Sequence, residues 1–127
     1  MARILVADDN AEYLSFFCEA VEQLGHSCDA VEDGNAVLDR MAKGKYDILF
    51  LDLIMPGRGA ISTLHAVREL DQTVPIIIIS GNTVVFESPI VTQGLQLAQA
   101  KMSKFTGLQK LGELIDRFVG QKSESST

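Results

Sequence analysis

The stretch ARILVADDN, residues 2–10, runs from four apolar residues directly into two adjacent aspartates. A short apolar run without strict alternation that stops at a polar pair is typical of a strand buried on both faces of a parallel sheet. This strand ends in two negative charges, Asp8 and Asp9. Carboxylates held this close raise each other's proton affinity or require a cation. The stretch therefore predicts a parallel sheet and a site that compensates negative charge.

The same strand pattern recurs further along the chain. It is clear in YDILFLD (residues 46–52) and PIIIIS (residues 75–80), and weaker strands are expected at residues 28–32 and 100–103. Apolar residues at helical spacing separate the strands, which predicts five helices. These helices are expected between Asn10 and Gly25, between Gly34 and Gly44, over residues 61–67, from Pro89 through Leu95 and Leu97, and over residues 108–118.

Strands that alternate with helices favour an α/β fold with right-handed crossovers. Five strands at this spacing predict a flavodoxin-like, doubly wound parallel sheet of order 2-1-3-4-5, with helices on both faces. In this topology the ligand crevice lies at the carboxyl ends of strands one and three. One domain is expected over residues 1–119, followed by a polar tail at residues 120–127.

Composition excludes several classes of protein. Of the 127 residues, 46% are apolar and 22% are charged, which is typical of a globular domain rather than a disordered chain. The formal net charge of −6 argues against direct binding of nucleic acid. No apolar run reaches the length of a membrane span or forms a signal peptide, so no membrane contact is expected and the cytoplasm is the expected location.

Three carboxylates are predicted to meet at one edge of the sheet. Asp8 and Asp9 end the first strand and Asp52 ends the third, and these strands are neighbours in the predicted order. A hard divalent cation that prefers oxygen ligands relieves the repulsion among carboxylates, and Mg²⁺ is the expected ion.

Two further side chains are expected near this edge. Ser80 ends the fourth strand, directly before Gly81, and Lys104 follows the fifth strand. A metal, a hydroxyl and a lysine beside an acid cluster suit phosphoryl transfer, because cations neutralise the phosphoryl oxygens while a nucleophile attacks in line. Asp52 is the expected nucleophile.

At these residues the sequence resembles the receiver domain of two-component response regulators, over nearly the whole chain. VADDN (residues 6–10) resembles the acid pair of that family, LDLIMPG (residues 51–57) its phosphoacceptor segment, and IIIISG (residues 76–81) its switch strand. The resemblance implies that Asp52 accepts a phosphoryl group from a histidine kinase or a histidine phosphotransfer protein.

The resemblance also implies the metal ligands. Asp9, Asp52 and the backbone carbonyl of Ile54 would coordinate Mg²⁺, with Asp8 helping through water.

Two further residues would respond to phosphorylation. Ser80 would swing toward the phosphoryl oxygens and Lys104 would pair with them. Phosphorylation adds up to about two negative charges. It would thereby switch a surface formed by residues 80–105 and the following helix, on which a downstream protein docks.

The chain departs from the family pattern around the lysine. Phe105 stands in SKFTGL where the family has a proline. Lys101 is an alternative to Lys104, because it lies closer to the usual distance from Ser80. Lys104 fits the distance from Asp52 better, and Lys101 then occupies a position where the family often has an aromatic residue.

Other functions compete with a phosphoacceptor. A pseudo-receiver would signal by protein binding without phosphorylation. An aspartyl-phosphate phosphatase would need a second acid where Ile54 stands, and a nucleotide or flavin site would need a phosphate-binding loop where Asp8 and Asp9 repel phosphate. The favoured reading is therefore a signalling domain rather than an enzyme. It is either a stand-alone receiver or a fragment of a larger response regulator, and either a monomer or a phosphorylation-dependent dimer.

Overall fold

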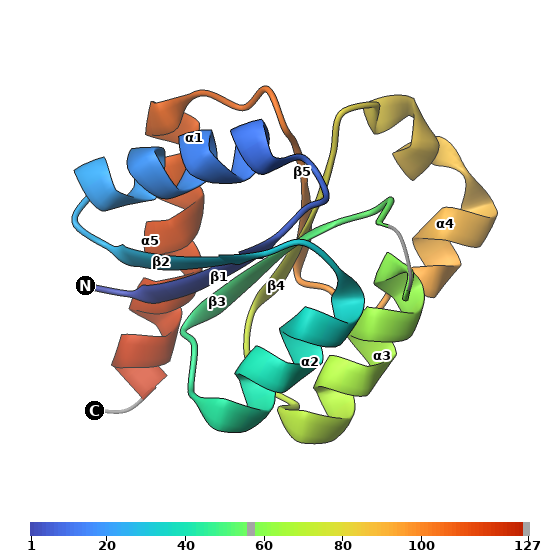
Figure 1. The fold of residues 1–127 in the computed structure, drawn as a ribbon, viewed down its shortest axis with the longest axis horizontal. Coiled ribbons are helices and arrows are strands. Elements are labelled where there is room, and N and C mark those ends of the chain that lie inside the picture. The colour runs from blue at the N-terminus through green and yellow to red at the C-terminus, as the bar shows by residue number, and fades with distance from the viewer. Residues whose placement is uncertain (56–57, 126–127) are drawn as a thin grey trace.

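A single five-stranded parallel sheet forms the centre of the molecule in the computed structural model (Figure 1). The structure describes residues 1–55 and 58–125, and side chains only as far as residue 120. The elements in chain order are β1 (Arg3–Ala7), α1 (Ala11–Gln23), β2 (Ser27–Val31), α2 (Gly34–Lys43), β3 (Ile48–Asp52), α3 (Ala60–Leu70), β4 (Ile76–Ser80), the 3₁₀ helix η1 (Thr83–Glu87), α4 (Pro89–Gly94), β5 (Ala100–Ser103) and α5 (Leu108–Ser125). The strand order is β2-β1-β3-β4-β5, so the predicted flavodoxin-like topology is confirmed.

Helices cover both faces of the sheet, with α1 and α5 on one side and α2, α3 and α4 on the other (Figure 1). Alternate residues of β3 enter opposite cores. Ile48 and Phe50 pack in the core that contains residues of α1 and α5, whereas Leu49 and Leu51 pack in the core with residues of α2 and α3. All four side chains are fully buried. Burial on both faces explains why the central strands are continuously apolar.

The boundaries of α1 follow the predicted signals. The side chain of Asn10 caps the helix by accepting a hydrogen bond from the backbone N–H of Tyr13, at 3.1 Å. The chain leaves the helix at Gly25, whose φ of +92° is favourable for glycine and strained for other residues. Because Asn10 caps α1, the chain passes from β1 into the helix within a few residues, and this fixes the backbone after Asp8 and Asp9.

The helix predicted from Pro89 through Leu97 is shorter than expected. Pro89 is its first residue, as predicted, but α4 ends at Gly94, so the expectation that it includes Leu95 and Leu97 is wrong. Leu95 turns out of the helix at φ −102° and ψ 14°, and its side chain is 2% exposed in the core. Burial of this leucine therefore ends the helix, and η1 precedes it where the sequence predicted no element.

Helix α5 continues to Ser125, beyond the predicted domain boundary at residue 119. Most of the segment expected as a polar tail is therefore helical, while residues 126–127 lie outside the described part of the chain. The division of the chain at residue 119 stays a prediction. Among the described residues, no helix combines the length and the apolar character that crossing a membrane requires.

Candidate functional site

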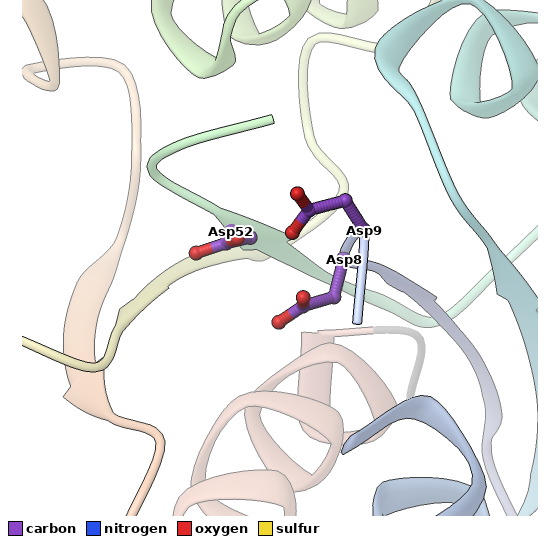
Figure 2. Close-up of side chains that lie close together, drawn as sticks. All are labelled: Asp8, Asp9 and Asp52. Carbon is purple, nitrogen blue, oxygen red and sulfur yellow. The ribbon is translucent and has the colours of Figure 1, made fainter. Parts of the chain in front are cut away.

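Three aspartates meet at the carboxyl ends of β1 and β3, as the sequence predicted (Figure 2). Asp8 and Asp9 follow β1, and Asp52 is the last residue of β3, the strand that pairs with β1. Each contributes a carboxylate oxygen to a cluster in which these atoms lie within 4.8 Å of one another. Asp8 is fully buried and Asp52 is 5% exposed, whereas Asp9 is exposed.

Backbone hydrogen bonds fix the orientation of Asp8. Its N–H donates to the carbonyl of Val31 at 3.1 Å, which continues the pairing of β1 with β2 by one residue. Its Oδ1 accepts a hydrogen bond from the N–H of Asn10 at 2.8 Å, at the start of α1. The other oxygen, Oδ2, faces Lys104 and accepts no backbone hydrogen bond from the part of the chain that the structure describes.

Lys104 contacts this aspartate cluster, whereas Lys101 lies against Phe86. The Lys104 ammonium is 2.5 Å from Asp8 Oδ2 and 3.4 Å from Asp52 Oδ2. Its backbone N–H donates to the carbonyl of Ser80 at 3.0 Å, which fixes the chain after β5. The ammonium of Lys101 lies instead over the ring of Phe86, at 5.7 Å. Of the two candidate lysines, only Lys104 has the position that the predicted chemistry needs.

Phe105 does not prevent this placement. Its side chain is 83% exposed. No cis peptide bond occurs in the described part of the chain, so the bond between Lys104 and Phe105 is trans. Lys104 thus reaches the aspartates without the proline that the family has after its lysine.

Ser80 and Ile54 lie beside the aspartates. Ser80 is 3% exposed, and its hydroxyl donates to the carbonyl of Asn82 and accepts from the N–H of Asn82, both at 3.1 Å. The backbone N–H of Ile54 lowers the pKa of Asp52, and the Ile54 side chain is 70% exposed. The role of the Ile54 carbonyl as a metal ligand stays a prediction. Within the predicted phosphoacceptor segment, residues 56–57 lie outside the described residues.

The site carries more negative than positive charge, and its pKa shifts reflect this. Burial, followed by the charge of Asp8, raises the pKa of Asp52 to about 6, although Lys104 and the Ile54 N–H act in the opposite direction. Burial alone would lower the pKa of Lys104, but its bonds to Asp8 and Asp52 outweigh burial and raise it. The lysine is therefore charged, and its ammonium pairs with two of the three clustered carboxyl groups, those of Asp8 and Asp52.

The side chains fit a hard divalent cation. The clustered donors are carboxylate oxygens, which Mg²⁺ and Ca²⁺ prefer over nitrogen or sulfur. Asp8 Oδ2 is buried and, among the described residues, receives no hydrogen bond of regular geometry in addition to its ion pair with Lys104. A bound cation would coordinate this buried oxygen, which can still accept a further bond. The cation would also offset the free-energy cost of burying clustered carboxylates.

The raised pKa of Asp52 predicts a pH-dependent stability. Between its ordinary value of 3.8 and about 6, the folded metal-free protein binds more protons at this group than the unfolded chain does. Its free energy of unfolding therefore falls as the pH rises through this range, and the loss is complete above about pH 6. Urea unfolding in EDTA should show Asp52→Asn gaining stability relative to the wild type as the pH rises. A constant difference across the range would contradict this prediction.

Two aromatic residues of α1 differ from the expectation from sequence. Tyr13 was not singled out, yet its ring lies beneath the Lys104 ammonium, with 5.1 Å between the ring centroid and Nζ. Its place in the first turn of the helix that follows the aspartates is the signal that could have identified it. For Phe16, which directly precedes Phe17 on the apolar stripe, the sequence favours packing over an exposed docking contact, and this is wrong, because its side chain is 66% exposed. Phe17 takes the core position, since only one of two consecutive helical residues can face the sheet fully.

Comparison with known proteins agrees with the geometry. The family model for the response regulator receiver domain matches residues 4–111. The transcriptional regulatory protein CpxR of Escherichia coli (strain K12) is 36% identical over 81 residues, which are 64% of this chain and 34% of CpxR. The matching region thus spans about a third of the length of that relative.

Solved receiver domains share the fold. The receiver domain of the Francisella response regulator 1452 superposes with a TM-score of 0.83 at 23% identity, covering 96% of this chain and 99% of that one. The receiver domain of the sensor histidine kinase PA1611 of Pseudomonas aeruginosa PAO1, solved with a magnesium ion in its active site cleft, gives a TM-score of 0.84 at 21% identity, covering 94% of this chain and 98% of that one.

Proposed function

The chain belongs to the response regulator receiver domain family of two-component signalling, and from this premise we propose that Asp52 accepts a phosphoryl group and thereby switches a protein-docking surface. The observation that carries the proposal is the juxtaposition of the Asp8, Asp9 and Asp52 carboxylates with the Lys104 ammonium at two neighbouring strand ends. A nucleophilic carboxylate, a cation site and a fixed positive charge are the components that phosphoryl transfer requires.

In the proposed reaction an oxygen of Asp52 attacks the phosphorus of a phosphohistidine. The P–N bond breaks, its electron pair goes to the imidazole nitrogen, and a P–O bond to Asp52 forms. Asp8, Asp9, Asp52 and the carbonyl of Ile54 would hold Mg²⁺, which supplies positive charge to the phosphoryl oxygens. Lys104 supplies a second positive charge from the side of α1. The Ile54 N–H favours the charged form of the attacking carboxylate, because it lowers the pKa of Asp52.

A phosphoryl group on Asp52 would compete with Asn82 for the hydroxyl of Ser80. The phosphoryl oxygens are new acceptors for the Ser80 hydroxyl, which donates to the Asn82 carbonyl in the unphosphorylated protein. If Ser80 turns inward, it releases Asn82, whose own side chain accepts from the N–H of Val84 at the start of η1. The local charge change would thus reach η1 and α4 through Asn82.

The proposed partners are a histidine kinase or phosphotransfer protein as donor, and a downstream protein that reads the switched surface. Both belong to the cytoplasm in this proposal. The domain itself acts on no separate substrate, and it catalyses only its own phosphorylation and dephosphorylation. Relatives such as CpxR are transcriptional regulators, but the matched region is only 34% of CpxR, and the proposal assigns no DNA contact to this domain.

The test uses the purified chain, Mg²⁺ and acetyl phosphate. Intact mass and a phosphate-affinity gel should show a phosphoryl adduct that forms with Mg²⁺ and not in EDTA, because the acid cluster repels the donor when no cation neutralises it. Mass is the suitable readout, since the chain has no tryptophan for fluorescence quenching. If the protein binds Mg²⁺ but forms no adduct with acetyl phosphate or with a phosphorylated donor protein, it is a pseudo-receiver.

A further inference from the structure

We propose that Tyr13 is a positioning residue for Lys104, whose ammonium it holds against the aspartates with the face of its ring. This inference rests on the proposed function, because it assumes that Lys104 supplies charge to the transferred phosphoryl group. The Lys104 Nζ lies 5.1 Å from the centroid of the Tyr13 ring, within the range of about 6 Å for a cation–π interaction. The ammonium is therefore enclosed by the ring on one side and by two carboxylates on another.

The ring is itself held by the sheet that carries the nucleophile. Tyr13 packs on Phe17, with 6.1 Å between the ring centroids. Phe17 meets Phe50 edge to face, with the centroids 4.9 Å apart and the planes at 61°. Phe50 is fully buried in β3, two residues before Asp52. A continuous set of aromatic contacts thus sets the position of the lysine relative to Asp52.

Lys104 needs such a support because its side chain is long and flexible. Its ammonium lies closer to Asp8, at 2.5 Å, than to Asp52, at 3.4 Å. When the Lys104 ammonium leaves Asp8, it has to stay near Asp52 in order to pair with the phosphoryl group. Without a support, the ammonium would move out into solvent instead. The Lys104 side chain is 17% exposed, so solvent weakens the interaction between its ammonium and the Tyr13 ring only partly.

The ring, and not the hydroxyl, performs this role. Among the described residues the Tyr13 hydroxyl has no hydrogen-bond partner. Burial and the charges of Asp8 and Asp52 raise the pKa of Tyr13, so the hydroxyl stays neutral. Phenylalanine should therefore replace Tyr13, and an aliphatic residue of similar size should not.

The first experiment compares Tyr13→Phe with Tyr13→Leu in the Mg²⁺-dependent reaction with acetyl phosphate. Tyr13→Phe should react within twofold of the wild type. Tyr13→Leu should be slower by between about twofold and about 30-fold, the range that cation–π energies correspond to. Phe16→Leu removes an exposed ring from the same helix and should leave the rate unchanged. Equal rates for Tyr13→Phe and Tyr13→Leu would overturn the proposal.

A second readout does not depend on phosphorylation. In the metal-free protein, an amine-acylating reagent followed by peptide mass spectrometry reports how accessible each lysine is. Tyr13→Leu should raise the labelling of Lys104 several-fold and leave Lys101 as an internal reference, whereas Tyr13→Phe should change neither. Unchanged labelling of Lys104 in Tyr13→Leu would show that the ring does not hold the ammonium.

The Lys104→Met background separates this inference from the proposed function. If Tyr13 acts through Lys104, Tyr13→Leu should have no further effect on the rate in that background, and an additional loss there would overturn the inference. If Lys104→Met alone reacts at the wild-type rate, the proposed role of Lys104 fails, whatever Tyr13 does. Should Tyr13→Leu fail to fold, fluorinated phenylalanines at position 13 weaken the ring face at nearly constant volume. The rate should then fall with each added fluorine, and a flat series would refute the proposal.

Discussion

The Asp52→Asn variant should form no phosphoryl adduct with Mg²⁺ and acetyl phosphate under conditions that fully convert the wild type. An amide oxygen is a far weaker nucleophile than a carboxylate, and the substitution also removes one of the three clustered charges. The side chain keeps its size at a site that is 5% exposed, so the fold should persist. Intact mass measures the adduct, and circular dichroism checks the fold.

A matched control for this substitution lies on α5. Asp116 is exposed there, and Asp116→Asn makes the same change of charge outside the aspartate cluster. It should phosphorylate at the wild-type rate. An adduct that persists in Asp52→Asn would place the phosphoryl group on another residue, and peptide mapping of the adduct would identify that residue.

The sheet could be predicted because its strands have simple environments. Residues such as Ile48 and Leu49 face opposite cores, and both are fully buried, so the apolar run alone indicates a central strand. The segment after β4 has no such signal. Its helix ends at Gly94, where an added Cβ would lie 2.5 Å from Ile61 Cδ1 of α3, and Leu95 enters the core. Both features depend on tertiary contacts, which the periodicity of apolar residues along the chain does not predict.

The acidic part of the site could be predicted for a topological reason. The carboxyl ends of neighbouring parallel strands share one edge, so Asp8 and Asp52 meet whatever the detailed packing. The choice between Lys101 and Lys104 could not be made in this way. It depends on which side chain reaches the aspartates, and Phe86 of η1, an element that the sequence did not predict, lies against Lys101. The contact of Tyr13 with Lys104 also depends on the packing of α1, so the sequence indicates only that Tyr13 lies in the first helical turn after the aspartates.

The Lys104→Met variant should lose stability in the metal-free state and regain most of it with Mg²⁺. Without the ammonium, fully buried Asp8 and nearly buried Asp52 face each other with no countercharge. Breaking a buried ion pair costs about 3–5 kcal/mol. Because Lys104 is partly exposed and one carboxyl can take up a proton, we expect a loss of about 2 kcal/mol. Urea unfolding in EDTA and in Mg²⁺ measures both values.

Binding of Mg²⁺ replaces the missing positive charge, so the ion should stabilise Lys104→Met more than it stabilises the wild type. The matched control is Lys101→Met, which removes the same charge beside Phe86 and should show no such difference. Equal stabilisation of all three proteins by Mg²⁺ would mean that Lys104 and the cation do not neutralise the same carboxylates. Phosphorylation by acetyl phosphate should still be slower in Lys104→Met by about 100-fold, because the metal cannot also supply the charge that Lys104 directs at the phosphoryl oxygens.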